Sequence, residues 1–392
     1  MTTESNPTQA LLSWTENGQT HSAPWRSGNG SPPPARVVPG DDTMNADTAY
    51  RLACEGTAIL WFGDFQNARQ LLQALVRRTD RKSPAKQNSK KPALSITETF
   101  HKQRMAQAQR ARILGMLLIP FEAGHGISLR RAPDVQEACA AALGEADTPY
   151  VASLRELLGF ISAHEWRKKG VEIAALGARI HPHYGVFSPV RGEYIDLVVR
   201  ADLPKVMEKQ SLAFDIGTGT GVIAALLAHR GVKRIVATEL DERALACARE
   251  NIKRLGFAPR VDILQADLFP PGQAPLIVCN PPWLPGKPAT PLEHAIYDQD
   301  SAMLRGFLQG LAAHLSPGGQ GWLLLSDLAE RLGLRSETML AELIAAAGLK
   351  VLGRLDIRPR HPRSQDEQDP LHAARSQEVT TLWRLAPNKP AE

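Results

Sequence analysis

The 392-residue sequence has few cysteines and no long hydrophobic run. Its four cysteines are widely spaced and form no CxxC pair, which argues against a disulfide framework and a structural zinc site. No apolar stretch approaches ~18 residues, so a membrane span is excluded. The first ten residues lack the basic start and apolar core of a secretory signal. We therefore expect a cytoplasmic, reduced protein that binds no metal.

The sequence also has little net charge, but the charge is unevenly spread. The total is +5, whereas the stretch from Arg77 to Arg112 holds eleven Lys or Arg residues and two acids. That stretch carries +9, which leaves −4 for the rest of the chain. A basic patch of this kind is a candidate contact for RNA or the ribosome, and a solvated loop explains it equally well.

The length predicts more than one domain. Residues 1–45 are rich in Ser, Thr, Gly, Asn and Pro and predict a disordered tail. Residues 46–165 are predicted to form a helical domain, which is a candidate for substrate recognition. Within it, Asp64 is predicted to be a helix N-cap, and a second helix is predicted at about 97–117. Residues 166–205 contain short β-prone pieces between Gly and Pro, and they predict a linking hairpin.

Residues 206–392 alternate between apolar, strand-like segments and amphipathic helices. Continuous apolar strands between helices predict a parallel sheet that is covered on both faces. The last two candidate strands, LKVLGRLDI and EVTTLWRL, have no helix between them, so the final strand should run antiparallel. We therefore expect an α/β fold with a Rossmann-like seven-stranded sheet, preceded by the helical domain and the linking hairpin.

A glycine-rich loop follows the first of these strands and leads directly into a helix. It reads Asp215-Ile216-Gly217-Thr218-Gly219-Thr220-Gly221, and we call residues 217–221 the glycine loop. Glycines let the backbone turn tightly and approach a ligand. Val222 stands where the dinucleotide pattern has its third Gly, and the Gly-Lys-Ser/Thr of a phosphate-binding loop is absent. These differences argue against a nicotinamide-dependent oxidoreductase and favour a ligand without pyrophosphate.

Acidic residues mark the ends of the next two strands. Glu239 is suited to a bidentate grip on ribose hydroxyls. Asp267 can accept a hydrogen bond from an adenine amino group, and Leu268 can cover the ring. Because parallel strands end at one edge of a sheet, we expect Asp215, Glu239 and Asp267 to share that rim. Three negative charges there suit a cationic ligand such as a sulfonium.

The fourth strand runs into Asn280-Pro281-Pro282-Trp283, which we call the acceptor loop (residues 280–283). Two consecutive prolines have no N–H to pair in a sheet, so they hold a rigid loop. The Asn280 side-chain oxygen and the Pro281 carbonyl can then accept both hydrogens of a planar –NH2 group. Trp283 offers a flat surface for stacking. Tyr297 and Asp298, beyond this loop, are candidates for substrate contact.

In combination, the glycine loop, Glu239, QADLF and NPPW resemble a class I S-adenosylmethionine-dependent methyltransferase of the N-methylating branch over about residues 170–385. The resemblance implies that residues 217–221 wrap the methionine part and that Glu239 holds the ribose. It also implies that Asp267 and Leu268 frame the adenine and that the acceptor loop orients the acceptor nitrogen.

Within that branch the sequence is most similar to HemK/PrmC-type protein glutamine N5-methyltransferases. The similarity includes the VFSPVRGE segment at 186–193, where Val190 splits the family's Pro-Arg pair. It implies methylation of a protein glutamine and a partner in the translation machinery. The same tetrapeptide class serves enzymes that methylate the exocyclic amine of adenine or guanine in RNA, so a base N-methyltransferase remains an alternative. A lesser alternative is a non-catalytic RNA- or ribosome-binding protein on this fold.

Overall fold

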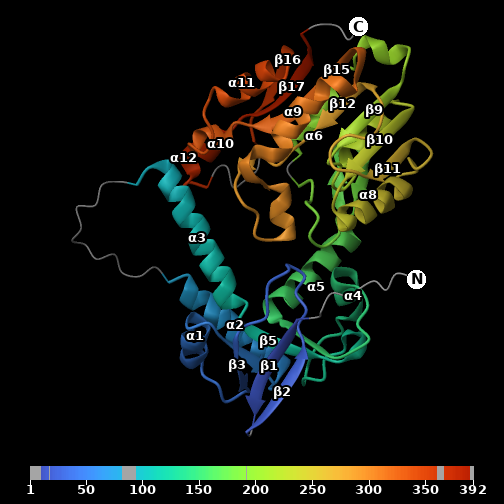
Figure 1. Cartoon of the computed structure of the whole chain (residues 1–392). Helices are drawn as coiled ribbons and strands as arrows, with labels where there is room; N and C mark the ends of the chain where they lie inside the picture. Colours follow the sequence, from blue (N-terminus) through green and yellow to red (C-terminus); the bar gives the residue numbers. More distant parts are fainter. Residues whose placement is uncertain (1–9, 17, 82–93, 191, 360–365, 389–392) are drawn as a thin grey trace, which may run out of the picture. The chain divides into compact units, whose positions relative to one another are not determined.

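The computed structural model describes residues 10–16, 18–81, 94–190, 192–359 and 366–388 (Figure 1). Its contacts divide the chain into two compact units, which we call the N-terminal and C-terminal units. The N-terminal unit comprises Met1–Leu94 and His101–Glu165, and the C-terminal unit comprises Ser95–Phe100 and Trp166–Glu392. No helix among the described residues is long and apolar enough to cross a membrane.

The N-terminal unit is a small α/β unit. Its sheet has the order β3-β4-β5-β6, in which β3, β4 and β5 are parallel and β6 is antiparallel. A separate hairpin is formed by β1 and β2. The elements are β1 (Leu11–Glu16), β2 (Gln19–Pro24), β3 (Arg36–Gly40), α1 (Ala46–Cys54), β4 (Thr57–Trp61), α2 (Phe65–Thr79), α3 (Ile96–Leu114), β5 (Leu117–Phe121), α4 (Gln136–Leu143), β6 (Tyr150–Ser153) and α5 (Leu154–Lys169).

The prediction that residues 1–45 form a disordered tail was wrong for the part that the structure describes. Three strands lie between residues 11 and 40. Leu12 and Trp25 are buried in one apolar cluster with Leu60 and Leu118 of the sheet. Backbone pairing and a few well-spaced apolar side chains order this segment, although its composition is polar overall.

The prediction of a mainly helical domain at 46–165 missed three segments that are strands. Their sequences, TAILW, LLIPF and YVAS, are short apolar runs. Periodicity alone does not distinguish such runs from buried helical segments. The helix N-cap was predicted correctly: the Asp64 carboxylate accepts the backbone N–H of Gln66 at 2.8 Å. Part of the basic stretch, residues 82–93, lies outside the described residues.

The C-terminal unit contains a seven-stranded sheet of order β11-β10-β9-β12-β15-β17-β16. All neighbouring pairs are parallel except those that involve β17, which is antiparallel as predicted. The strands are β7 (Val171–Ile173), β8 (Ala178–Ile180), β9 (Leu212–Ile216), β10 (Arg234–Glu239), β11 (Val261–Gln265), β12 (Ala274–Cys279), β13 (Leu284–Pro285), β14 (Tyr297–Asp298), β15 (Leu315–Ser326), β16 (Leu349–Ile357) and β17 (Thr380–Pro387). The helices are α6 (Glu193–Arg200), α7 (Val222–His229), α8 (Glu242–Arg254), α9 (Ala302–His314), α10 (Leu328–Arg331), α11 (Met339–Ala346) and α12 (His372–Arg375).

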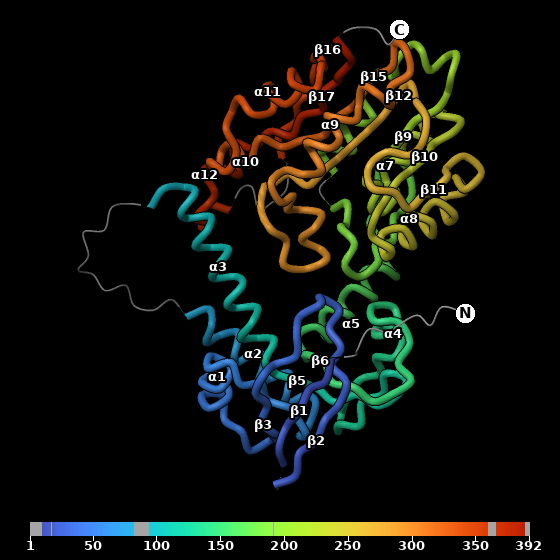
Figure 2. The backbone as a smooth tube through the Cα atoms, viewed as in Figure 1, coloured from blue at the N-terminus to red at the C-terminus, as the bar shows by residue number. Residues whose placement is uncertain are grey.

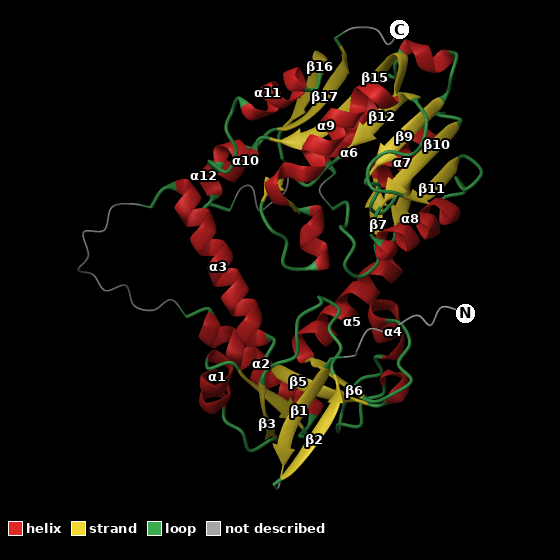
Figure 3. Cartoon of the chain, viewed as in Figure 1, coloured by secondary structure: helices red, strands yellow, loops and turns green. Residues whose placement is uncertain are grey.

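Helices cover both faces of this sheet (Figure 3). Alternate residues of the central strand β12 show why: Leu276 and Val278 join the apolar core that contains α6 and α7. Ile277 and Cys279 join the core on the other face, which contains α9 and α11. Strands that are buried on both faces must be apolar throughout, and this accounts for the continuous runs in the sequence. The predicted hairpin within 166–205 is formed by β7 and β8.

Candidate active site

The glycine loop turns through three residues with positive φ. Gly217, Gly219 and Gly221 have φ values of +70°, +56° and +81°. This region of backbone conformation favours glycine because a Cβ would clash with the chain itself. A Cβ on Gly221 would also meet the Ala248 backbone of α8 at 3.4 Å, so the loop lies close against that helix.

Asp215 holds the glycine loop from behind. Its carboxylate accepts the Thr218 hydroxyl at 2.5 Å and the Ala224 N–H of α7 at 3.0 Å. The residue is fully buried within β9, and its second oxygen has no hydrogen-bond partner. Burial raises the pKa of Asp215 to about 7, although its hydrogen bonds with Thr218 and Ala224 act in the opposite direction. Asp215 therefore shapes the loop from inside the sheet.

Glu239, Asp267 and Leu268, which were also predicted to bind the methyl donor, lie at the same edge of the sheet as the glycine loop. The Glu239 carboxylate accepts the Gly219 N–H at 3.0 Å, which places it directly at the loop. Asp267 is exposed just after β11. Leu268 has a positive φ of 66°, and the Thr238 hydroxyl donates to its carbonyl at 2.6 Å. A Cβ on Gly306 of α9 would lie 2.6 Å from the Leu268 side chain, so that glycine makes room for it.

The acceptor loop begins where β12 ends, beside the strand that carries the glycine loop. Cys279 of β12 pairs with Ile216 of β9, so Asn280 follows one strand and Gly217 the next. The Trp283 indole N–H donates to the Asn280 side-chain oxygen at 2.9 Å. This bond fixes the amide and indole relative to each other. An amide oxygen has two lone pairs, so one remains for another donor.

Asp298 does not fulfil the predicted role of substrate contact, because its side chain is buried and caps a helix. Its carboxylate accepts the N–H groups of Met303 and Leu304, each at 3.1 Å, at the start of α9. Asp300 and Ser301, between them, have positive φ values of 57° and 53°, so the cap holds an unfavourable turn in place.

Met303 was not predicted as a site residue, yet it contacts the glycine loop. A Cβ on Gly217 would lie 2.5 Å from the terminal methyl of the Met303 side chain. Only glycine allows this approach, since its φ is also positive there. Met303, at the start of α9, therefore packs against the backbone of the glycine loop. A single flexible apolar residue gives no sequence signal for such a contact.

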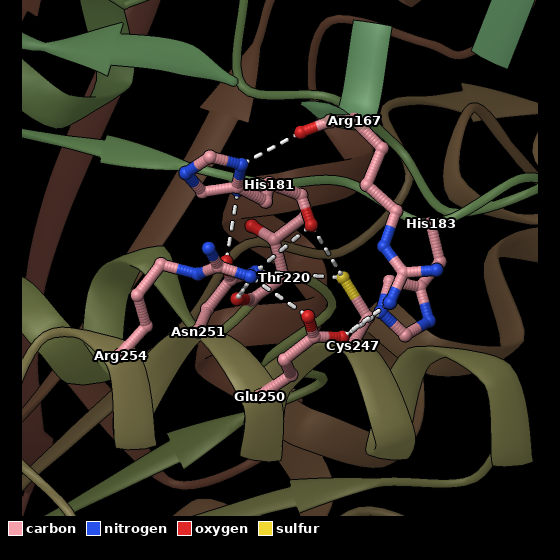
Figure 4. Close-up of polar contacts among 8 residues, drawn as sticks. All are labelled: Arg167, His181, His183, Thr220, Cys247, Glu250, Asn251 and Arg254. Carbon is pink, nitrogen blue, oxygen red and sulfur yellow. Dashed lines mark hydrogen bonds and ion pairs between the residues drawn. The ribbon is translucent and has the colours of Figure 1, made fainter. Parts of the chain in front are cut away.

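Asn251 of α8 was also missed, and it connects the glycine loop to the segment after the linking hairpin (Figure 4). Its amide nitrogen donates to the Thr220 carbonyl at 3.1 Å, and its oxygen accepts the His181 N–H at 2.8 Å. The side chain is fully buried. The sequence does contain a sign of this role: Asn251 lies on the apolar face of an amphipathic helix, and a buried amide requires hydrogen-bond partners.

His183 and Arg167 extend this network through Glu250 (Figure 4). The Glu250 carboxylate contacts the His183 ring nitrogen at 2.7 Å and the Arg167 guanidinium at 2.5 Å. Burial lowers the pKa of His183, although the hydrogen bond with Glu250 raises it. Burial also raises the pKa of the nearby Cys247 thiol to about 11, so this cysteine is a packed thiol and no reactive nucleophile. The network fixes α8 under the glycine loop.

This arrangement fits a ligand with an amino-acid end, a ribose and a flat ring. The glycine loop leaves backbone groups free to approach a ligand closely, the Glu239 carboxylate can accept hydroxyl donors, and Leu268 offers an apolar surface. The acceptor loop supplies a second, separate set of acceptors on the neighbouring strand. The glycine loop and the acceptor loop thus lie at adjoining strand ends.

Comparison with known proteins identifies the domain. Residues 177–327 match the family model described as the methyltransferase small domain. This segment is similar to that family, and we call residues 177–327 the methyltransferase domain. The domain includes the glycine loop, Glu239, the acceptor loop and Asp298, and the match confirms the family resemblance of the sequence motifs.

Curated relatives of this methyltransferase domain carry two kinds of name. A protein of Cereibacter sphaeroides named release factor glutamine methyltransferase is 36% identical over 170 residues, which is 39% of this chain and 59% of that protein. A protein of Pedobacter heparinus named tRNA1(Val) (adenine(37)-N6)-methyltransferase is 37% identical over 118 residues, which is 28% of this chain and 50% of that protein. The chain thus spans about half to three fifths of the length of these two relatives.

Solved structures give a weaker likeness. The ribosomal protein L11 methylase of Lactobacillus delbrueckii subsp. bulgaricus has a TM-score of 0.31 and 17% sequence identity, covering 45% of this chain and 70% of that one. We base the fold assignment on the strand order of the seven-stranded sheet and draw no argument from this structural similarity.

Proposed function

We propose that this protein transfers a methyl group from S-adenosylmethionine to a planar –NH2 nitrogen of a macromolecule. The observation that carries the proposal is the pairing of β9 with β12, which brings the glycine loop and the acceptor loop to adjoining strand ends. S-adenosylmethionine supplies a methyl group on a positively charged sulfur, which is already activated for displacement. The task of the protein is therefore mainly to position the nitrogen in line with that methyl group.

Different residues bind the different parts of S-adenosylmethionine, the methyl donor. The glycine loop holds the amino-acid end, because its backbone can approach closely. The Glu239 carboxylate accepts the ribose hydroxyls, and its bond to the Gly219 N–H keeps it at the loop. Asp267 accepts the adenine amino group, and Leu268 covers the ring. Asp215 maintains the loop conformation that these contacts need.

On the acceptor side, the Asn280 oxygen and the Pro281 carbonyl accept the two hydrogens of the –NH2 group. The Pro281 and Pro282 rings keep this segment rigid, and the Trp283 ring supports the planar acceptor. Holding both hydrogens directs the nitrogen lone pair to one face. The carbon–sulfur bond breaks with its electron pair on sulfur as the nitrogen–carbon bond forms, and the nitrogen then releases a proton to water.

The acceptor that we favour is a protein glutamine, in line with the release factor glutamine methyltransferase of Cereibacter sphaeroides. A base of RNA is the second candidate. It is favoured by the relatives named for the N6 of a tRNA adenine and by the flat indole of Trp283, which suits a ring as well as an amide.

The first test separates these acceptors. A lysate from a strain that lacks the gene is incubated with the purified protein and S-adenosylmethionine labelled in its methyl group. Label that protease removes supports the glutamine acceptor, and label that ribonuclease removes supports the base. Thermal stabilisation by S-adenosylmethionine is measured in parallel, because a non-catalytic fold that binds no donor would lack it.

The second test is Asn280→Ala. We expect label transfer to fall at least about 100-fold, because the –NH2 group loses one of its two acceptors and its alignment. The dissociation constant of S-adenosylhomocysteine, measured by calorimetry, should stay near that of the wild type. Undiminished transfer in this variant would contradict the proposal that Asn280 and Pro281 hold the –NH2 group. Lys253→Ala, at an exposed position on α8, serves as the control.

A further inference from the structure

Residues 95–100 belong to the C-terminal unit, although the chain on both sides of them belongs to the N-terminal unit. They form the first turn of α3 and the residue before it. Figures 1 and 2 show the start of this helix, in cyan, beside the red α10 and α12. We call residues 95–100 the anchor. Nothing in the sequence motifs of the methyltransferase domain points to it.

The start of the anchor is fixed by a capping box. The Ser95 hydroxyl accepts the Glu98 N–H at 3.2 Å, and the Glu98 carboxylate accepts the Ser95 N–H at 2.8 Å. These reciprocal bonds satisfy backbone donors that the helix leaves open at its N-terminus. The first turn of α3 is therefore stabilised by hydrogen bonds between its own residues.

The anchor is attached to the rest of the C-terminal unit by a close polar contact. The Thr97 hydroxyl donates to the Leu332 carbonyl at 2.8 Å, just after α10. A Cβ on Gly333 would lie 2.5 Å from the Thr97 oxygen, and the φ of Gly333 is +66°. Only glycine allows this approach, so the α10 turn is shaped to receive Thr97.

Phe100 provides the apolar part of the attachment. Its side chain is only 6% exposed. It packs in one cluster with residues of the acceptor side, α10 and α12: Leu284, Leu328, Ala329, Leu332, Leu371 and Ala374. An aromatic side chain buried in this way contributes a large share of the local packing. The cluster lies beyond the carboxyl ends of β12 and β15, at the rim where the acceptor loop lies.

Leu284 joins this cluster directly to the acceptor loop, because it follows Trp283 in the chain. Its N–H donates to the Ile296 carbonyl at 3.1 Å, and β13 pairs with β14. The end of the acceptor loop is thus held by a short ladder on one side and by the Phe100 cluster on another. Leu284 is the chain neighbour of Trp283, whose indole N–H donates to the Asn280 side-chain oxygen at 2.9 Å.

We propose that the anchor positions the acceptor loop, so that Thr97 and Phe100 are positioning residues for methyl transfer. The proposal rests on the proposed function of the acceptor loop. Neither residue belongs to the glycine loop or to the acceptor loop. Phe100 packs in one cluster with Leu284, Leu284 follows Trp283 in the chain, and the Trp283 indole bonds to the acceptor oxygen of Asn280. A segment that is 180 residues upstream in the chain therefore sets the geometry of the clamp.

The test uses full-length protein labelled with 5-fluorotryptophan and observed by ¹⁹F NMR. The chain has seven tryptophans, and Trp283→Phe identifies the signal of Trp283 by its loss. In Phe100→Ala we expect the Trp283 signal to shift or broaden and label transfer to lysate acceptors to fall at least about tenfold. The dissociation constant of S-adenosylhomocysteine should change less than about twofold, because the glycine loop is not part of the cluster.

Two further variants separate positioning from a loss of folding. Phe100→Leu keeps an apolar side chain and should restore most of the transfer rate. Thr97→Val keeps the shape of the side chain but removes its bond to the Leu332 carbonyl, and it should move the Trp283 signal without unfolding the protein. Met105→Ala is the matched control, since that side chain on the same helix is 74% exposed.

The outcomes are distinct. An unchanged Trp283 signal and an unchanged transfer rate in folded Phe100→Ala and Thr97→Val would overturn the role of the anchor. If the wild type transferred no methyl group to any acceptor, the proposed function would fail. The ¹⁹F signal would then decide alone whether residues 95–100 hold the acceptor loop.

Discussion

At the scale of single residues, Asp215 combines two demands that conflict. Its hydrogen bonds with Thr218 and Ala224 favour the ionised carboxylate, whereas its burial favours the neutral acid. Burial has the larger effect and raises the pKa to about 7. Near neutral pH this carboxyl therefore contributes less than a full negative charge to the rim, and its main effect is on the shape of the glycine loop.

This pKa predicts how stability depends on pH. Between about pH 4 and 7 the folded protein holds a proton on Asp215 that the unfolded chain has released, so this group lowers the free energy of unfolding as pH rises. Asp215→Asn mimics the neutral acid and removes that dependence. We expect the variant to gain a few kcal/mol relative to the wild type between pH 5 and pH 8, since one pKa unit corresponds to ~1.4 kcal/mol.

Urea unfolding at several pH values measures this difference. Asp262→Asn, which changes an exposed carboxylate on β11, is the control and should show no such trend. A difference between Asp215→Asn and the wild type that stays constant from pH 5 to pH 8 would contradict the assignment of the raised pKa to this residue.

At the scale of secondary structure elements, α9 depends on a cap from outside its own first turn. Ser301 stands at the N-cap position but makes no side-chain cap bond, and Asp298 of β14 supplies the carboxylate instead. This connects the short β13–β14 ladder after the acceptor loop to the helix whose Met303 bears on Gly217. Asp298 therefore supports the start of the helix that carries Met303.

The prediction for this element concerns Asp298→Ala. It leaves the Met303 and Leu304 N–H groups without their acceptor, and we expect a loss of about 0.5–2 kcal/mol in the free energy of unfolding. S-adenosylhomocysteine should also bind more weakly, because Met303 loses its fixed place against the glycine loop. Urea unfolding and calorimetry measure the two effects. Asp298→Asn keeps an acceptor oxygen, so a loss as large in Asn as in Ala would argue against capping.

The central strands β9, β10 and β12 of the seven-stranded sheet were predictable from sequence, because they are mostly buried apolar runs. The antiparallel direction of β17 was predicted correctly, although the reason given for it was wrong: the four-residue helix α12 lies between β16 and β17. The N-terminal unit was not predictable. Its strands are short, and the pairing of β1 with β2 or the burial of Trp25 depends on partners that composition does not reveal.

The candidate site was predictable only where function requires unusual residue types. Positive φ demands the glycines of the loop, and a strand that ends in two prolines demands a rigid turn. The supports of the site are ordinary residues in ordinary patterns. Asn251, Met303 and Phe100 act through contacts with residues that are tens to more than two hundred positions away in the sequence, and only the folded chain brings these residues together.

At the scale of the whole molecule, each of the two units has its own sheet and its own apolar core. The core of the N-terminal unit includes a cluster around Leu60 and Leu118. The cores of the methyltransferase domain lie on the two faces of its seven-stranded sheet. Units with separate cores can unfold separately, and a ligand stabilises only the unit to which it binds.

We therefore expect two transitions in scanning calorimetry, of which S-adenosylhomocysteine raises only one. At a concentration of about 100 times the dissociation constant, the ligand adds ~2.7 kcal/mol to the unit that contains the glycine loop. For a unit of this size that corresponds to a rise of roughly 5–10 °C in one midpoint, while the other stays in place. Phe65→Ala, which removes a fully buried side chain of the N-terminal unit, should lower only the other midpoint. A single transition, or an equal shift of both midpoints with ligand, would show that the two units unfold as one.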